Sequence, residues 1–148
     1  MPLLQRDLER GAASALVFCD LDQFASFNYR NGHSRGDELL RLVGSVLTSV
    51  TEHAAGHDER VAYRVGGEEF LIRLSDSDLH EAEALAQEAR RKIKELPTQS
   101  EGPFSARFAI AAWTDGQAPT LTSLLDAAED SLRRSPKRDA VVIIPLDR

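Results

Sequence analysis

The apolar positions along the chain follow two different spacings, and each spacing predicts a different kind of element. Nearly continuous apolar runs at residues 15–19 and 140–144 are typical of strands that are buried on both faces. Apolar side chains at every second position predict a further strand within residues 104–113. Apolar residues three or four positions apart predict amphipathic helices over about residues 36–50, 79–96 and 121–132. The pattern therefore predicts a mixed α/β protein.

Two adjacent glycines, Gly66 and Gly67, lie between two more short apolar runs. Two glycines in this position predict a tight antiparallel hairpin in which both residues have positive φ. Glu68 and Glu69 follow directly, at the tip of that hairpin. Bare backbone beside paired acids suits a polyphosphate that is held by main-chain groups and metal ions. The alternative is an ordinary turn with solvated glutamates.

The order of the expected elements predicts the topology. Strand, helix, hairpin, helix and strand form a ferredoxin-like βαββαβ core of the α/β (α+β) class, with one appended helix and strand. We expect a single domain over residues 1–148, with its core at about 15–145 and an N-terminal helix or linker at 1–11. In this topology the end of the first strand and the hairpin tip lie at the same edge of the sheet. Asp20, Asp22, Glu68 and Glu69 are therefore expected to converge.

Composition narrows the classes of function. A net charge of −6 argues against a broad basic face that binds nucleic acid. The single cysteine allows no intrachain disulfide and favours a reducing compartment. We recognise no secretory signal or membrane span, so the expected location is the cytoplasm and no membrane partner is expected.

The acidic cluster favours a particular kind of metal. An all-oxygen ligand set suits Mg²⁺ or Mn²⁺, and Mg²⁺ typically takes one or two carboxylates together with substrate phosphates. One cysteine and four scattered histidines offer no ligand spacing for zinc. For Asp22, a metal ligand and a residue that stabilises its loop by hydrogen bonds both remain open.

Several of these segments belong to one wider pattern. Its parts are Asp20-Leu21-Asp22-Gln23-Phe24, Asn28, Gly32-His33, Gly36-Asp37 and Arg64-Val65-Gly66-Gly67-Glu68-Glu69-Phe70. Together, in this order and spacing, they resemble the GGDEF domain of bacterial diguanylate cyclases. The resemblance extends from about residue 15 to the last expected strand, and it implies the fold of the nucleotidyl cyclases.

The resemblance also implies a reaction and its participants. Two GTP molecules, held by two facing copies of the domain in a homodimer, would condense to cyclic di-GMP with Mg²⁺ (or Mn²⁺). The implied catalytic residues are Asp20, Glu68 and Glu69, and the implied metal ligands are the same three side chains with the carbonyl oxygen of Leu21. The implied substrate-binding residues are Asn28 and Asp37 at the guanine, Gly66 and Gly67 at the phosphates, and also Phe24 and Arg138. Each of three residues also has a purely structural alternative: Asn28 as a helix C-cap, Asp37 as an acid at a helix start, and Phe24 as a core residue.

The chain departs from the family pattern at several points. Ala25 stands where the family usually has lysine, and Tyr29 replaces an aspartate. The phosphate-binding lysine near the C-terminus has no clean counterpart, so Arg134 or Lys137 is a candidate for its charge. The family's opening segment is expected to be absent, and residues 57–60 do not form the Arg-x-x-Asp product-inhibition motif. An alternative function is therefore a catalytically weak module that binds GTP or a regulatory partner protein.

Overall fold

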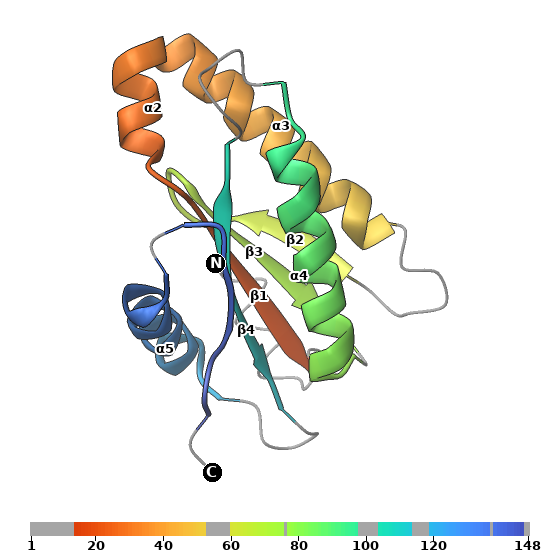
Figure 1. Ribbon diagram of the computed structural model, residues 1–148. Coiled ribbons are helices and arrows are strands. Elements are labelled where there is room, and N and C mark those ends of the chain that lie inside the picture. Colours follow the sequence, from red (N-terminus) through yellow and green to blue (C-terminus); the bar gives the residue numbers. More distant parts are fainter. Residues whose placement is uncertain are drawn as a thin grey trace.

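The computed structural model describes residues 14–52, 60–75, 77–97, 104–113, 119–136 and 138–146 (Figure 1). The expected N-terminal helix or linker and residues 57–59 of the inhibition-motif position lie outside these described residues. Among the helices of the described part, none is long and apolar enough to cross a membrane.

The centre of the molecule is a five-stranded sheet with the order β2-β3-β1-β4-β5. Its strands are β1 (Ala15–Leu21), β2 (Arg60–Arg64), β3 (Glu69–Leu74), β4 (Ala106–Ala112) and β5 (Val141–Ile143). Neighbouring strands are antiparallel, except that β5 runs parallel to β4 at the edge. The first four strands have the predicted ferredoxin-like arrangement, and β5 is the predicted appended strand.

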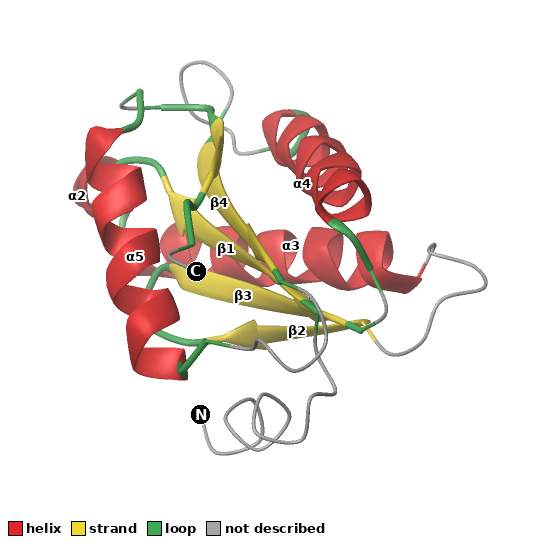
Figure 2. Cartoon of the chain, turned by 90° about the horizontal axis from the view of Figure 1, so that it is seen from below, coloured by secondary structure: helices red, strands yellow, loops and turns green. Residues whose placement is uncertain are grey.

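Four helices in the described residues cover the sheet. They are α2 (Phe24–Asn31), α3 (His33–Glu52), α4 (Leu79–Lys94) and α5 (Leu121–Arg134). The first three lie on one face of the sheet, and α5 lies on the other (Figures 1 and 2). Capping residues define two of the helix starts: Asp78 forms a capping box with Glu81, and Thr120 accepts from the amide of Ser123.

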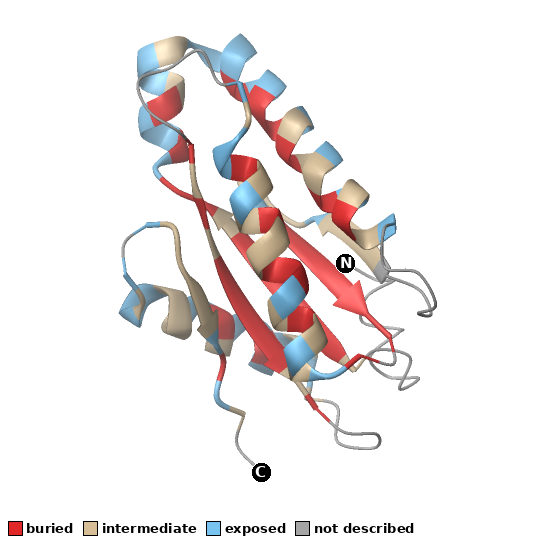
Figure 3. Ribbon diagram, turned by 45° about the vertical axis from the view of Figure 1, so that its right-hand side comes forward, coloured by how far each residue is buried: buried red, intermediate tan, exposed pale blue. Residues whose placement is uncertain are grey.

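The sheet therefore has a hydrophobic core on each face. The larger core joins β1, β3 and β4 to α2, α3 and α4, and the smaller one lies beneath α5. The central strand β1 contributes to both, since residues 15–19 are buried without exception (Figure 3). The apolar run at 15–19 thus predicted this strand correctly, and Cys19 is a buried core residue in it.

Two local predictions were wrong. Helix α3 begins at His33 rather than at Gly36, and it is separated from α2 by Gly32 at φ 89°, a conformation that favours glycine. In the hairpin, neither Gly66 nor Gly67 has the positive φ of a two-residue turn. Strands β2 and β3 are instead joined by residues 65–68, where Arg64 donates from Nε and Nη2 to the carbonyl oxygens of Gly66 (3.2 Å) and Gly67 (2.9 Å). A side chain thus fixes this turn.

Candidate active site

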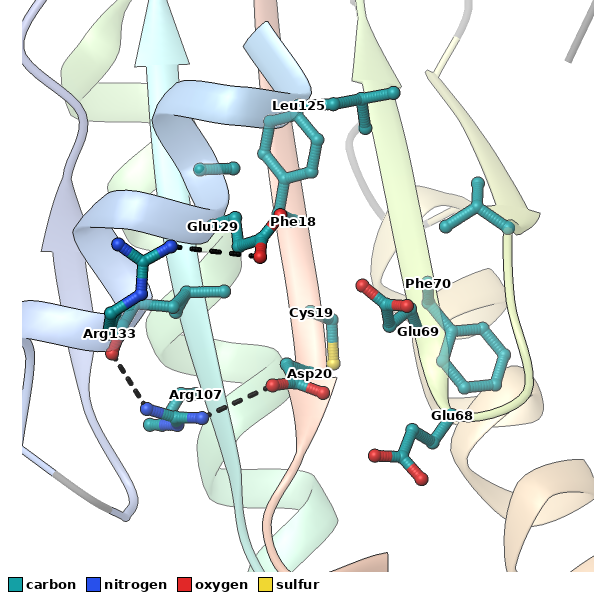
Figure 4. A pocket seen from close by; sticks show the side chains of 13 residues that line it. Phe18, Cys19, Asp20, Glu68, Glu69, Phe70, Arg107, Leu125, Glu129 and Arg133 are labelled. Carbon is teal, nitrogen blue, oxygen red and sulfur yellow. Dashed lines mark hydrogen bonds and ion pairs between the residues drawn. The ribbon is translucent and has the colours of Figure 1, made fainter.

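The predicted convergence of carboxylates occurs at the end of β1. Asp20 lies directly opposite Glu69 in the antiparallel β1–β3 ladder. The amide of Leu21 donates to the carbonyl oxygen of Glu68 at 3.3 Å, which holds the hairpin tip against the strand end. Asp20, Glu68 and Glu69 border a cleft of about 670 Å³ between the sheet and α5 (Figure 4).

The glycines of the hairpin leave space above the backbone. A Cβ atom on Gly66 would lie 3.0 Å from Oε1 of Glu69, so the glycine lets that carboxylate fold against the turn. A Cβ atom on Gly67 would meet nothing within 4 Å. Within the described part of the chain, the amide of Gly67 makes no hydrogen bond. The hairpin tip therefore offers an open main-chain donor beside two acids.

Asp20 lies in an environment that disfavours its ionised form. Burial raises its pKa from 3.8 to about 6, Arg107 acts in the opposite direction, and Glu69 and Glu68 raise the pKa further. The Asp20 carboxylate accepts from Nη2 of Arg107 at 3.2 Å. One cation therefore does not offset burial and the neighbouring acids.

Asp22 is a stabilising residue of its loop, which is one of the two roles left open by the sequence. It is 6% exposed, and its Oδ2 accepts from the hydroxyl of Ser105 (2.6 Å) and the amide of Asp139 (2.8 Å). Its Oδ1 lies 3.3 Å from Nε of Arg107. Asp22 thus ties the end of β1 to β4 and to the segment before β5.

Arg107 is the residue of the cleft that the sequence analysis missed. It lies on β4 opposite Asp20 and contacts both Asp20 and Asp22. Its Nη1 also donates to the carbonyl oxygen of Leu132 at 2.8 Å, at the end of α5. Its only signal in the sequence is a charged residue within an otherwise apolar strand.

The expected guanine-reading residues lie at the corner between α2 and α3. Oδ1 of Asn28 is buried and has no hydrogen-bond partner. A Cβ atom on Gly36 would lie 1.7 Å from that oxygen, so the glycine creates the space that the amide occupies. Asp37 follows Gly36 and is exposed within α3. Asn28 lies inside α2 and is not its C-cap, and Asp37 lies in the second turn of α3.

Two other expected substrate-binding residues lie elsewhere. Phe24 is 7% exposed and stacks on Phe27 with ring centroids 6.5 Å apart, as its core alternative predicts. Arg138 is exposed and donates to Oε1 of Gln23. Neither residue lines the cleft.

Of the two candidates for the charge of the missing lysine, the described one, Arg134, does not line the cleft either. Arg134 has an 80% exposed side chain and pairs with Asp130, and Lys137 lies outside the described residues. The cationic charge beside Asp20 comes from β4 instead.

The cleft fits Mg²⁺ or Mn²⁺ by the chemistry of its donors. Asp20, Glu68 and Glu69 supply only oxygen ligands, and burial first, then the charges of Glu69 and Glu68, raise the pKa of Asp20. Within the described ranges, no three Asp, Glu, His or Cys side chains are placed to hold a metal together. Mg²⁺ does not require three, because it commonly takes one or two carboxylates, waters and substrate phosphates. The roles of these residues and of the Leu21 carbonyl oxygen stay predictions.

Comparison with known proteins identifies the family. The GGDEF family profile, described as "Diguanylate cyclase, GGDEF domain", matches residues 2–140, and the chain belongs to this family. The match begins at residue 2, although residues 2–14 do not contain the family's Asp-x-Leu-Thr-Gly-Leu-x-Asn-Arg opening motif.

Individual relatives agree with this assignment. The chain is 29% identical over 145 residues to Diguanylate cyclase VdcA of Vibrio cholerae, covering 94% of this chain and 41% of that protein. It is 37% identical over 86 residues to Cyclic di-GMP phosphodiesterase NbdA of Pseudomonas aeruginosa, covering 58% of this chain and 10% of that protein. The chain therefore spans less than half the length of either relative.

The fold is also that of solved GGDEF structures. The GGDEF domain of DgcB from Caulobacter crescentus, solved in complex with c-di-GMP, has a TM-score of 0.78 and 26% identity to this chain. The alignment covers 97% of this chain and 86% of that one. The predicted nucleotidyl cyclase-like fold is thereby confirmed.

Proposed function

We propose that this chain is a diguanylate cyclase domain that condenses two GTP molecules into cyclic di-GMP. The observation that carries the proposal is the convergence of Asp20, Glu69 and Glu68 on one cleft at the edge of the sheet. Adjacent acids are costly unless a cation binds between them, so their convergence in a GGDEF protein favours metal-assisted chemistry. Family membership and similarity to VdcA support the same reaction.

The residues of the chain have separate tasks in this proposal. Asp20, Glu68 and Glu69 would hold Mg²⁺, and Gly67 would let the phosphates approach the backbone. The bound metal supplies charge neutralisation for the triphosphate and a lower pKa for the attacking 3′-hydroxyl. Asn28 has a free buried oxygen, and with Asp37 it would accept from the N–H groups on the guanine edge, which adenine lacks.

The proposed active form is a homodimer. One set of these residues serves one GTP, and the product contains two guanosines, so two copies must face each other. GTP is a cytoplasmic nucleotide, and we propose that the domain acts there. We further propose that the product does not inhibit at residues 57–60, because the sequence lacks the Arg-x-x-Asp motif at that position.

A second candidate is a weakly active module that binds GTP or a protein partner. The observation that favours it is the ion pair between Asp20 and Arg107, because this pair already places a positive group on the central carboxylate. Similarity to NbdA, whose name is that of a phosphodiesterase, is consistent with this role.

Product analysis distinguishes the two functions. Concentrated protein is incubated with GTP and Mg²⁺, and the nucleotides are separated by chromatography, beside a Glu69→Gln control of nearly the same size and shape. Cyclic di-GMP from the unmodified chain, and its loss in the control, is the expected result. GTP binding without product would support the second candidate, and neither binding nor product would contradict both.

A further inference from the structure

Two arginine side chains supply the positive charge of the cleft, and they differ in burial and in position. Among the described residues that line the cleft, the cationic ones are Arg107 on β4 and Arg133 on α5 (Figure 4). Arg133 is 65% exposed and pairs with Glu129 and Asp130 on its own helix. The Arg107 side chain is 20% exposed and lies beside Asp20. Arg107 is therefore the more buried of the two arginines, and it is the one that pairs with Asp20.

Several groups outside the acidic cluster fix one side of the Arg107 guanidinium. Its Nη1 donates to the carbonyl oxygen of Leu132 (2.8 Å) and to Oγ of Ser135 (3.4 Å), at the C-terminal end of α5. Its Nε lies 3.3 Å from Oδ1 of Asp22, an ion pair in which neither atom makes a hydrogen bond. The hydrogen bonds of Nη1 and this ion pair favour one orientation of the planar group without using Nη2.

The anchor Asp22 is itself held in place. Its other oxygen accepts from the hydroxyl of Ser105 and the amide of Asp139 at 2.6 and 2.8 Å. The side chain of Asp139 is bound in turn by Arg90 and Lys94 on α4, each at 2.8 Å. These contacts do not involve Asp20. The Arg107 guanidinium would therefore keep its position if Asp20 bound a metal ion.

The remaining nitrogen of Arg107 is directed toward the acidic cluster. Nη2 carries two N–H groups, and the structure gives it one contact, to Oδ2 of Asp20 at 3.2 Å. A carboxylate that coordinates a cation is a weaker partner for an arginine, so both N–H groups would become available. A guanidinium that is anchored through Nη1 can then present Nη2 to an anionic oxygen.

We propose that Arg107 is the phosphate-binding residue of the cleft, with Nη2 donating to a phosphate oxygen of the bound nucleoside triphosphate. Asp22 is its positioning residue, because its carboxylate forms an ion pair with the Nε side of the guanidinium. The proposal rests on the proposed function, namely that the cleft receives GTP. Arg107 would thus take the phosphate-binding role of the family's lysine. It does so from β4, which flanks β1 on the side away from the β2–β3 hairpin.

The competing role for Arg107 is structural, since it also ties the end of α5 to β4. The two roles differ in which part of a nucleotide they affect. A phosphate contact matters only for ligands with phosphates, whereas a displaced α5 would alter the cleft for any ligand. The test therefore compares 3′-deoxy-GTP, which lacks the attacking hydroxyl and cannot be turned over, with 3′-deoxyguanosine.

Dissociation constants for both ligands are measured with Mg²⁺ by ligand-observed NMR, which covers the millimolar range, for the unmodified chain, Arg107→Gln and Arg107→Lys. Arg134→Gln is the matched control, because it removes an arginine from an 80% exposed position outside the cleft. Thermal unfolding of each variant shows whether the fold is retained, and the lysine variant keeps the charge if glutamine destabilises the chain.

The expected result is that Arg107→Gln weakens 3′-deoxy-GTP binding about tenfold or more and leaves 3′-deoxyguanosine unchanged. Arg107→Lys should lie between the unmodified chain and the glutamine variant, and Arg134→Gln should have no effect. Equal losses for both ligands would assign Arg107 a structural role, and unchanged binding of both would exclude any role in the site. Failure of the unmodified chain to bind 3′-deoxy-GTP would instead overturn the proposed function.

Discussion

The two halves of the proposed nucleotide site are built in different ways. The helix-corner half consists of Asn28, Gly36 and Asp37, which come from two consecutive helices. The strand-edge half consists of Asp20, Glu68, Glu69 and Arg107, which come from β1, β3, β4 and the loop between β2 and β3. The first half depends on local spacing, and the second depends on how the sheet assembles.

The two halves also differ in what a substitution must preserve. A change in the helix corner must preserve a close fit, because Asn28 occupies the space that any side chain at position 36 would need. The strand edge needs only a suitable set of charges around the cleft. A cation can be supplied there from another strand, and Arg107 on β4 occupies such a position. The proposal thus predicts shape-dependent effects in one half and charge-dependent effects in the other.

The largest expected effect is on turnover, through the strand-edge half. Asp20→Asn removes the central carboxylate while preserving its size, and cyclase activity should fall about a hundredfold or more. Its stability at neutral pH should not fall, because the ionised aspartate is disfavoured in the folded chain. Initial rates of cyclic di-GMP formation and urea unfolding are the two measurements. Retained activity would show that the cleft is not the site of chemistry.

The next effect tests the fit of the helix corner. Gly36→Ala would place a Cβ atom 1.7 Å from Oδ1 of Asn28, so the amide must rotate away. GTP binding should weaken about tenfold, while stability should not decrease, because alanine is the better helix former and a terminal side-chain atom can move.

Asn28→Ala is the matched variant for this test. If Gly36→Ala acts only through Asn28, the double variant Asn28→Ala/Gly36→Ala should bind GTP no more weakly than Asn28→Ala alone. Calorimetry measures both affinities. Additive losses in the double variant would contradict the proposed contact.

A smaller effect is the pH dependence of stability that Asp20 introduces. Because its pKa is raised from 3.8 to about 6, the folded chain binds the proton more tightly than the unfolded chain does. The associated stability is present below about pH 4 and is lost as the pH rises through 6. Without divalent metal, Asp20→Asn should gain about 2 kcal/mol over the unmodified chain between pH 4 and 7, a value reduced for partial exposure.

Asp139 titrates at lower pH than Asp20, so its titration does not contribute to the stability change between pH 4 and 7. Hydrogen bonds from Lys94 and Arg90 lower the pKa of Asp139 against the opposing effect of burial. Its stabilising contribution is therefore complete above its ordinary pKa and is lost only as the pH falls below about 4. A stability difference between Asp20→Asn and the unmodified chain that stays constant from pH 4 to 7 would contradict the predicted environment of Asp20.

The smallest expected effect comes from the support behind Arg107. Asp139→Asn loses the charge that pairs with Arg90 and Lys94, and should cost about 1 kcal/mol of stability. Asparagine tolerates the φ of 50° at this position, and the amide that binds Asp22 remains. GTP affinity should therefore be unchanged. Weaker GTP binding at full stability would show that the side chain of Asp139 affects the site more directly.

Much of the fold could be predicted because its signals are local. The apolar run at 15–19 predicted the central strand, and the apolar spacing within 79–96 and 121–132 predicted two of the helices. The convergence of Asp20 and Glu69 followed from the order of the elements alone.

The missed features depend on side chains that meet across the fold. The hairpin turn is held by the Arg64 side chain, so two glycines alone did not determine its geometry. Gly36 was interpreted as a helix start, although its role is to make room for Asn28. Arg107 pairs with Asp20 from 87 positions away, and no local pattern can indicate such a pair.

The central claim is that one guanine nucleotide occupies both halves of the site. Two-dimensional NMR of the isotope-labelled chain, titrated with 3′-deoxy-GTP and Mg²⁺, tests it most directly. The account predicts that the amides of Gly67 and Glu68 shift together with those of Asn28 and Gly36, with the same dissociation constant. Shifts confined to one half, or two different dissociation constants, would contradict it.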